Sequence, residues 1–307
     1  MDFKNIKILV VGDIMLDEYI QGSSNRISPE APVPIVLVDS NSFSLGGAAN
    51  VASNCASLGA CVKLIGFTGI DDAGKKLAIK MQMDNVNYLG PIDKKVITTK
   101  KVRIMSRSQQ LLRVDHEKII NFRSNKLIDI YESVVKENDI VIFSDYGKGS
   151  LNQIETLIKI AKQNNKITCV DPIGYSFSKY ANVDFLKPNS KELKKVIGES
   201  KDENDFQEKV RHLMILNNIQ NIILTQSENG CILFYKQKNK IKSKLFTTKK
   251  REVYDVTGAG DVFISIFSLI IAKGISVDRA IEFANKGAGS VVEKLGTYKI
   301  KYTDIFE

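Results

Sequence analysis

Short apolar runs alternate with longer helical patterns along most of this chain, and no other feature limits its fold as strongly. The apolar runs have the length of buried strands, and they lie at 6–11, 62–67, 140–143, 167–170, 183–186 and 222–225. The helical patterns lie at 48–58, 72–83, 125–136, 151–162, 204–217, 262–272 and 277–294. Strands joined through helices usually pair in parallel, with helices on both faces of the sheet. The alternation therefore predicts a three-layer α/β/α fold around a mostly parallel sheet.

Three segments break this alternation, at 15–20, 34–38 and 97–115. They alternate polar and apolar residues, as the strands of a half-exposed sheet do. We expect them to form a small β-sheet lid over one end of the main sheet, with strands from about 14–39 and 97–115. Because no internal repeat or low-complexity linker interrupts the chain, we expect a single domain over residues 1–307.

The net charge of +9 allows three kinds of partner: nucleic acid, a membrane surface or a phosphorylated small molecule. Basic residues concentrate at 94–113 and 236–251, and the second cluster alternates as the solvated face of a hairpin does. The chain has no tryptophan and no basic stripe interleaved with aromatic residues, which argues against nucleic acid. The longest apolar stretch, 263–272, is too short to span a bilayer. Of the three, we expect a phosphorylated small molecule, with no nucleic-acid and no membrane partner.

The four cysteines form no C-x-x-C pair, and with only two histidines the chain has no zinc-binding spacing. Unpaired thiols fit a reducing compartment, and the first residues carry no signal-peptide cleavage pattern. We therefore expect a cytoplasmic protein.

The segment at 255–261, with the sequence DVTGAGD, places two glycines and a carboxylate where an apolar helix begins. The first amides of a helix have no partner within it and the helix dipole adds positive potential, so the segment predicts an anion cradle. Asp261 lies beside that cradle, where it can take a proton from a nucleophile attacking a phosphoryl group. With an ordinary pKa of about 4, it would be ionised at neutral pH. The alternative is a glycine turn capped by an aspartate.

Two further segments carry polar groups where a hydroxylated ligand would bind. Gly46 and Gly47 precede a helix and let backbone amides approach a ligand, and Asn50 offers both a donor and an acceptor. Asp13 and Asp17 follow the first strand and can accept hydrogen bonds from sugar hydroxyls. The structural alternatives are a helix entry packed through small residues and an aspartate that caps a turn.

Residues 187–192, KPNSKE, follow a strand and start a helix. Asn189 is a good N-cap and Glu192 suits a capping box, whereas the functional alternative is that Glu192 helps to hold hydrated magnesium. Two nucleotide signatures fail: 69–76 nearly matches a P-loop but has Lys76 at its last position, and no G-x-G-x-x-G follows the first strand.

The motifs GGAANVA at 46–52, PNSKE at 188–192 and DVTGAGD at 255–261, in this order, resemble those of the ribokinase-type (phosphofructokinase-B) sugar kinases, over essentially the whole chain. The resemblance implies ATP and magnesium, with a monovalent cation such as K⁺ as a further option. It implies Asp261 as catalytic base and the amides of Gly258, Ala259 and Gly260 as anion hole. It places sugar contacts at Asp17, Gly46, Gly47 and Asn50, nucleotide contacts at Asn189, Ser190, Lys191, Glu192, Thr225, Gly230 and Asn285, and the metal at Asn189 and Glu192.

Within this family, the strings at 26–34, 103–115, 144–149 and 294–297 are similar to those of the heptose 7-phosphate kinases. This similarity implies phosphorylation of D-glycero-β-D-manno-heptose 7-phosphate at its anomeric hydroxyl, on the route to ADP-heptose and lipopolysaccharide core. In many bacteria that kinase is fused to an adenylyltransferase, and we expect only the kinase activity from residues 1–307. One departure is Ile173, which stands where that group usually carries a lysine after Asp171-Pro172.

The basic segment at 100–113 suggests contacts to a sugar phosphate, because arginine binds phosphate through two parallel hydrogen bonds. Strand alternation allows only part of this set to face inward. The expected substrate contacts are Asp13, Arg103, Arg107, Gln109, Arg113, Asp145 and Lys148. Exposed strand edges and the resemblance also predict a homodimer through the lid. The alternatives are another sugar or sugar-phosphate kinase, or a nucleic-acid-binding or regulatory protein on a kinase fold.

Overall fold

The computed structural model describes residues 1–306 except 108, 239, 249–254, 295 and 297. Those positions include Ser108, Leu295 and Thr297 of the strings compared above and part of the basic cluster at 236–251, so these parts of the predictions lie outside the described residues. In the described part, the central sheet contains, in spatial order, β13 (Lys240–Phe246), β12 (Cys231–Gln237), β11 (Asn221–Thr225), β10 (Phe185–Leu186), β9 (Ile167–Asp171), β8 (Ile140–Ser144), β1 (Lys7–Gly12), β4 (Cys61–Ile65) and β5 (Val86–Tyr88). Strands from β11 to β5 pair in parallel, and the hairpin β12–β13 extends the sheet antiparallel.

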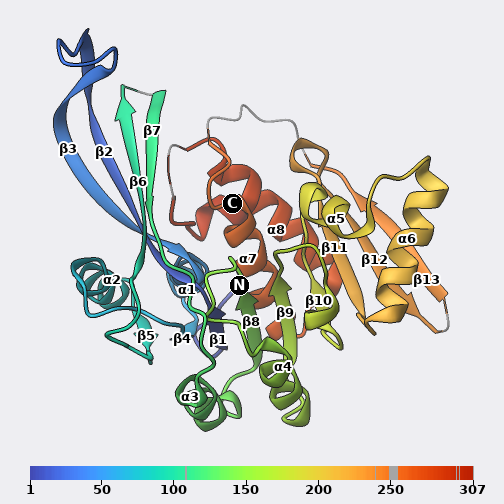
Figure 1. The fold of residues 1–307 in the computed structure, drawn as a ribbon. Coiled ribbons are helices and arrows are strands. Elements are labelled where there is room, and N and C mark those ends of the chain that lie inside the picture. Colours follow the sequence, from blue (N-terminus) through green and yellow to red (C-terminus); the bar gives the residue numbers. More distant parts are fainter. Residues whose placement is uncertain (108, 239, 249–254, 295, 297, 307) are drawn as a thin grey trace.

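Helices cover both faces of this sheet (Figure 1). Successive side chains of β1 show why: Ile8 and Val10 belong to one buried cluster, whereas Leu9 and Val11 belong to the other. The first cluster includes residues of α1 (Ala48–Ser57), α2 (Asp72–Met83), α7 (Ala259–Ala272), α8 (Val277–Val291) and α9 (Thr303–Phe306). The second includes residues of α3 (Asn125–Val135), α4 (Ile154–Gln163), α5 (Ser190–Ile197) and α6 (Glu203–Leu216). The predicted three-layer α/β/α fold is confirmed.

A second sheet extends from one end of the central sheet (Figure 1). Its order is β3 (Pro34–Gly47), β2 (Ile14–Ile27), β6 (Thr99–Ser106) and β7 (Gln109–His116). The three predicted segments are confirmed as strands. The segment 97–115 forms two strands, β6 and nearly all of β7. β2 and β3 run well beyond 15–20 and 34–38, because they pair with each other over nearly their full length.

Register decides which side chains of this small sheet lie together, because directly paired residues project from the same face. Asp17 pairs with Lys101, and Tyr19 pairs with Arg103. Arg103 in turn pairs with Arg113. We call this side, which also carries Asp115, the inner face. The outer face carries apolar residues: Ile20, Val102, Ile104, Leu112 and Val114.

Helix α7 is mostly apolar and is buried along nearly its whole length, with Asp261, Ser265 and Ser268 as its polar residues. Its N-cap, Gly258, has φ +81°, a left-handed conformation that glycine adopts without steric cost. This turn directs the first helical amides toward the carboxyl ends of the parallel strands. In the described part of the chain, no helix is both long and apolar enough to cross a membrane.

Candidate active site

Polar residues gather at the carboxyl ends of neighbouring parallel strands, facing the start of α7. Asp13 follows β1, Asp145 follows β8, Asp171 ends β9 and Lys187 follows β10. Asp13, Asp145 and Lys187 are buried. Since ligands of open α/β sheets bind at this edge, it is the place where a reaction centre is expected.

Asp261 lies in the first turn of α7 and is only 5% exposed. Its Oδ1 accepts a hydrogen bond of 2.7 Å from the hydroxyl of Tyr146, and its Oδ2 accepts one of 2.7 Å from Nδ2 of Asn50. Burial raises the pKa of Asp261 to about 6, although these two donors oppose the shift. The ordinary value of about 4 expected from the sequence is therefore wrong for this environment. Asp261 is still mainly ionised at pH 7 and above.

The anion cradle predicted from the glycines has a fixed positive charge beside it. Lys187 is 5% exposed, and its Nζ lies 3.0 Å from Oδ1 of Asp171. Burial alone would lower the pKa of Lys187, but the neighbouring carboxylates, Asp171 first, raise it above its ordinary range. A Cβ built on Gly260 would lie 3.4 Å from Nζ of Lys187, so the charge lies next to the first turn of α7.

Lys187 and Asp171 were not among the predicted site residues. A sequence signal for them existed, since each immediately precedes a proline at the end of a predicted strand. Tyr146 was also missed, although its string SDYGKG at 144–149 had been compared.

A cavity of about 380 Å³ opens on one side of this centre. Predicted nucleotide contacts that line it are Asn189, Thr225, Gly230 and Asn285, together with Gly260 of the cradle. Lys187 lines it too, and Val256, Phe263, Ala288 and Val292 supply an apolar wall. A cavity with a buried cation at one end and an apolar wall suits a nucleoside triphosphate. Ser190, Lys191 and Glu192 do not belong to its lining.

Both the structural and the functional hypotheses for Glu192 concern the start of α5, and the capping geometry is present there. Oδ1 of Asn189 accepts from the amide of Glu192 at 2.9 Å, and Oε2 of Glu192 accepts from the amide of Asn189 at 2.8 Å. Within the described residues, no group of three or more His, Cys, Asp or Glu side chains could hold a metal ion. A magnesium ion here would depend on one or two carboxylates together with nucleotide phosphates and water, which is its usual mode.

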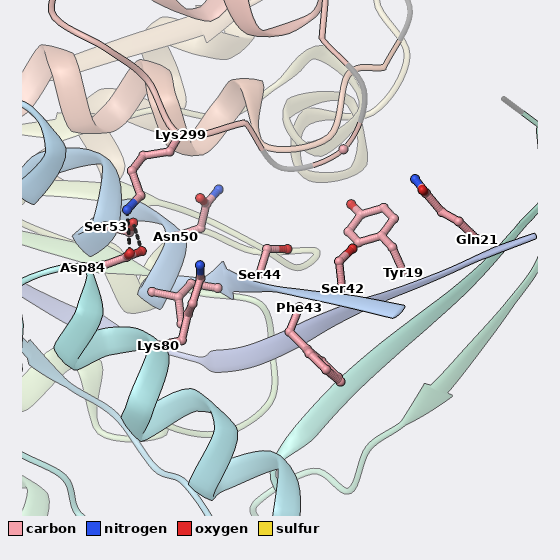
Figure 2. Close-up of a pocket in the computed structure, with 12 residues that line it drawn as sticks. Tyr19, Gln21, Ser42, Phe43, Ser44, Asn50, Ser53, Lys80, Asp84 and Lys299 are labelled. Atoms are coloured by element: carbon pink, nitrogen blue, oxygen red, sulfur yellow. Dashed lines mark hydrogen bonds and ion pairs between the residues drawn. The ribbon is translucent and has the colours of Figure 1, made fainter. Parts of the chain in front are cut away.

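A second cavity, of about 290 Å³, is lined by residues of the small sheet and of the helices α1 and α2, with Asn50 among them (Figure 2). Its polar lining includes Tyr19, Ser42, Ser44, Asn50, Ser53, Lys80 and Lys299. Lys299 pairs with Asp84 at 2.5 Å, and Asp84 also accepts from Ser53 at 2.6 Å (Figure 2). Asn50 thus lines this cavity and also donates to Asp261, so one side chain connects the cavity lining with the predicted base.

The predicted sugar contacts on the small sheet separate into two groups. Arg103 pairs with Asp17 at 2.5 Å on the inner face, and both are buried. The carboxylate of Asp17 lies directly against Gly46, which leaves no space for a Cβ there. Gly47, with φ +57°, has equally little space, next to the carbonyl of Asp13. These residues form one cluster, and the charge of Asp17 acts on the nearby Tyr146.

Arg107, Gln109 and Arg113 were also predicted to contact the substrate, but they do not belong to this cluster. Arg107 is an exposed residue in the turn between β6 and β7, at the end of the sheet remote from Asp17, and Gln109 is exposed beside it. Arg113 lies on the inner face, but its guanidinium forms two hydrogen bonds to Asp115, of 2.9 and 3.0 Å. Arg107 and Gln109 therefore do not line the two cavities of their own chain, and their role as sugar-phosphate contacts stays a prediction.

Asp13, Asp145 and Lys148 all have protein partners. The carboxylate of Asp13 accepts from the amides of Tyr146, Lys148 and Ser150, so it orders the loop after β8 rather than pointing into a cavity. Asp145 binds Lys179 at 2.8 Å. The side chain of Lys148 pairs with Glu117 at 2.6 Å.

The departure at Ile173 can be placed in the same region. A Cβ built on Gly147 would lie 3.7 Å from Cγ2 of Ile173, so this apolar side chain borders the loop after β8. The basic partner of Asp145 in this loop region is Lys179.

The chain is similar to known proteins over nearly its whole length. A family model described as pfkB family carbohydrate kinase matches residues 5–303. Relatives named bifunctional protein HldE are 40% identical over 301 residues in Chromohalobacter salexigens and 41% identical over 306 residues in Actinobacillus succinogenes. These matches cover 98% and 99% of this chain. The chain spans 63% of the length of each relative.

Solved structures agree on the fold. The phosphofructokinase-2 of Escherichia coli in complex with potassium matches with a TM-score of 0.79 at 18% identity, over 99% of this chain and 97% of that one. The ribokinase of Arabidopsis thaliana, complexed with ribose and ATP, matches with a TM-score of 0.75 at 20% identity, over 97% of this chain and 96% of that one.

Proposed function

The chain belongs to the pfkB family of carbohydrate kinases, and on this premise we propose that it transfers the γ-phosphoryl group of ATP to the anomeric hydroxyl of D-glycero-β-D-manno-heptose 7-phosphate. The observation that carries the proposal is the place of Asp261. Its carboxylate accepts a hydrogen bond from Asn50, which lines the cavity of about 290 Å³, while its neighbours Ala259 and Gly260 line the cavity of about 380 Å³ together with Lys187. The choice of sugar rests on the strings at 26–34, 103–115 and 144–149.

Each group has a role that follows from its surroundings. Asp261 accepts the proton of the attacking hydroxyl, because it is ionised above about pH 6 and is held in place through hydrogen bonds. The first amides of α7 and the ammonium of Lys187 stabilise negative charge on the phosphoryl oxygens. Asn189, Thr225, Gly230 and Asn285 position the nucleotide in the cavity of about 380 Å³.

Magnesium bound with ATP would neutralise part of the charge on the phosphates. Asn189 and Glu192 are the residues of this chain proposed to lie near it, Glu192 through water while its carboxylate keeps the capping contact. A potassium ion, as in the complex named above, is a further proposed cofactor with no residue assigned to it.

The phosphate of the acceptor needs cations near the cavity of about 290 Å³. Basic groups on this side are Lys101 and Arg103 on the inner face and Lys80 and Lys299 in the cavity lining, of which Arg103 and Lys299 already pair with Asp17 and Asp84. We assign the phosphate to this set, in place of Arg107 and Gln109 of the same chain.

We also propose a homodimer and a cytoplasmic location. On the outer face of the small sheet, Leu112 is 54% exposed and Val114 is 37% exposed. Apolar side chains on an exposed sheet are commonly covered by a partner, and here a second copy of the chain is the proposed partner. All four cysteines are free thiols, which fits a reducing compartment.

A coupled ADP-release assay across sugar phosphates tests the proposed function. We expect heptose 7-phosphate to be strongly preferred over unphosphorylated heptose, ribose and fructose 6-phosphate, with no turnover when the sugar is omitted. Equal rates with the unphosphorylated heptose would contradict the assignment of a sugar phosphate, and preference for another sugar phosphate would make the chain a different kinase of the same family.

A further inference from the structure

Tyr146 donates to the proposed base, and no role has been assigned to it so far. We infer, on the basis of the proposed kinase function, that Tyr146 is a positioning residue for Asp261: its hydroxyl holds the carboxylate in the orientation in which the free lone pair of Oδ1 faces the attacking sugar hydroxyl. A carboxylate has about four lone-pair sites, so Oδ1 can accept from Tyr146 and from the sugar together. Tyr146 itself does not take part in proton transfer.

The loop that carries Tyr146 is rigidly held. The backbone amide of Tyr146 donates to Oδ2 of Asp13 at 2.9 Å. Two further amides of the same loop, at Lys148 and Ser150, donate to the Asp13 carboxylate at 2.9 and 2.8 Å. Asp13 is 1% exposed, so these hydrogen bonds are shielded from water. The hydroxyl of Tyr146 is therefore presented to Asp261 from a fixed backbone.

The opposite oxygen of Asp261 is held equally well. Nδ2 of Asn50 donates to Oδ2 at 2.7 Å, and the amide orientation of Asn50 is set by Asn54, whose Nδ2 donates to Oδ1 of Asn50 at 3.0 Å. With one donor on each oxygen, rotation of the carboxylate about its Cβ–Cγ bond would break two short hydrogen bonds. Removal of the Tyr146 hydroxyl would leave only one of the two restraints.

Tyr146 is also suited to remain a donor at every working pH. Burial first, and then the negative charge of Asp261, raise the pKa of Tyr146 well above its ordinary range, so the phenol keeps its proton. A hydrogen bond donated to a buried carboxylate favours its ionised form. Loss of this bond should therefore raise the pKa of Asp261 above the value of about 6.

The other charged groups around this pair stay in place when only the hydroxyl is removed. Asp171 and Lys187 face Asp261 from the ends of β9 and β10, with opposite effects on its pKa. Asp17 faces Tyr146 from β2, and Nζ of Lys101 on β6 lies 5.6 Å from the centre of its ring. A Tyr146→Phe variant keeps the ring that packs against Lys101.

The experiment compares Tyr146→Phe with Tyr131→Phe in the full chain. Tyr131 is a matched control, because it is a buried tyrosine whose hydroxyl has no hydrogen-bond partner among the described residues. ADP release is measured from about pH 5 to about pH 9 with saturating ATP and heptose 7-phosphate. We expect Tyr146→Phe to lower kcat by roughly 10- to 100-fold with little change in KM, and to move the acid limb of the profile up by about one pH unit or more.

A base works only when deprotonated, so a raised pKa must shift this limb toward higher pH. The Tyr131→Phe profile should coincide with that of the wild type. If the acid limb of the Tyr146→Phe profile also coincides with that of the wild type, the inference is overturned. In that case the kinase assignment would still stand, provided that Asp261→Asn is inactive.

A second measurement does not depend on turnover. Carbon-13 NMR of the carboxyl groups of the free protein, assigned through Asp261→Asn, follows the titration of Asp261 directly. We expect a higher Asp261 pKa in Tyr146→Phe and an unchanged one in Tyr131→Phe. If the wild type titrates at the expected pH but phosphorylates no sugar, the proposed function fails and the positioning role is still decided by this shift. An unchanged pKa in Tyr146→Phe sinks the inference whatever the activity.

Discussion

Replacement of Lys187 with methionine removes one charge of a buried ion pair. The side chains of Lys187 and Asp171 are 6% and 15% exposed, and the charged atoms lie 3.0 Å apart. The Asp171 carboxylate would then stay largely buried without its main partner. Loss of one member of such a pair typically costs about 3–5 kcal/mol. We expect Lys187→Met to lose unfolding free energy of this size at about pH 8.

The free energy that Lys187→Met loses should also depend on pH. Burial already raises the pKa of Asp171, and Lys187 opposes that shift. In Lys187→Met the folded-state pKa should rise further above the unfolded value of about 4, so the folded state binds the extra proton. Stability then falls as pH rises between these two values, by up to about 1.4 kcal/mol per pH unit. The deficit should therefore be smaller at about pH 5 than at about pH 8.

Urea unfolding followed by far-UV circular dichroism measures this loss, since the chain has no tryptophan to report by fluorescence. Asp171→Asn and the double variant complete a thermodynamic cycle, in which the double variant should lose less than the sum of the two single variants. A loss below about 1 kcal/mol at pH 8, or an equal loss at both pH values, would refute the reasoning.

Three further predictions concern the metal, the acceptor phosphate and the assembly. Glu192→Gln should raise the magnesium concentration needed for half-maximal rate if the residue serves the metal; an unchanged requirement in a magnesium titration, with a stability change of about 1 kcal/mol or less, would leave it as a cap only. Arg103→Met should raise the KM for the sugar phosphate about 10-fold or more, whereas Arg107→Ala should leave it unchanged, and the reverse order would show that the single-chain geometry misplaces the phosphate. Leu112→Asp should convert a dimer into a monomer near 34.2 kDa by light scattering, with Ile215→Asp on α6 as a control of similar exposure, and a wild type that is already monomeric would remove the dimer.

Local patterns of the sequence predicted most of the fold, because burial and helix periodicity depend on residues that are close together in the chain. The parallel strands and their helices follow from apolar runs that are buried on both faces, and α2 begins and ends at the predicted residues 72–83. The lengths of β2 and β3 were underestimated, because their outer halves are held by pairing with each other rather than by an apolar pattern. Such long-range pairing leaves little trace in either segment alone.

The candidate site was only partly predictable for the same reason. Asp261 and Asn50 stand in dense local motifs, whereas the contact between Tyr146 and Asp261 joins residues 115 positions apart. The position of Arg107 could not be predicted from the sequence, because strand register and the turn at 107 decide how far along the sheet a side chain lies. The raised pKa of Asp261 comes from burial, which no local pattern reveals.

Phosphorus NMR of the reaction between ATP and D-glycero-β-D-manno-heptose 7-phosphate tests the central claim most directly, because it identifies the atom that receives the phosphoryl group. The account predicts a new anomeric phosphate signal, retention of the 7-phosphate signal and formation of ADP. It also predicts a rate lower by roughly 10²–10⁴ for Asp261→Asn, with the fold retained. A product phosphorylated at another position, or an Asp261→Asn rate close to that of the wild type, would contradict it.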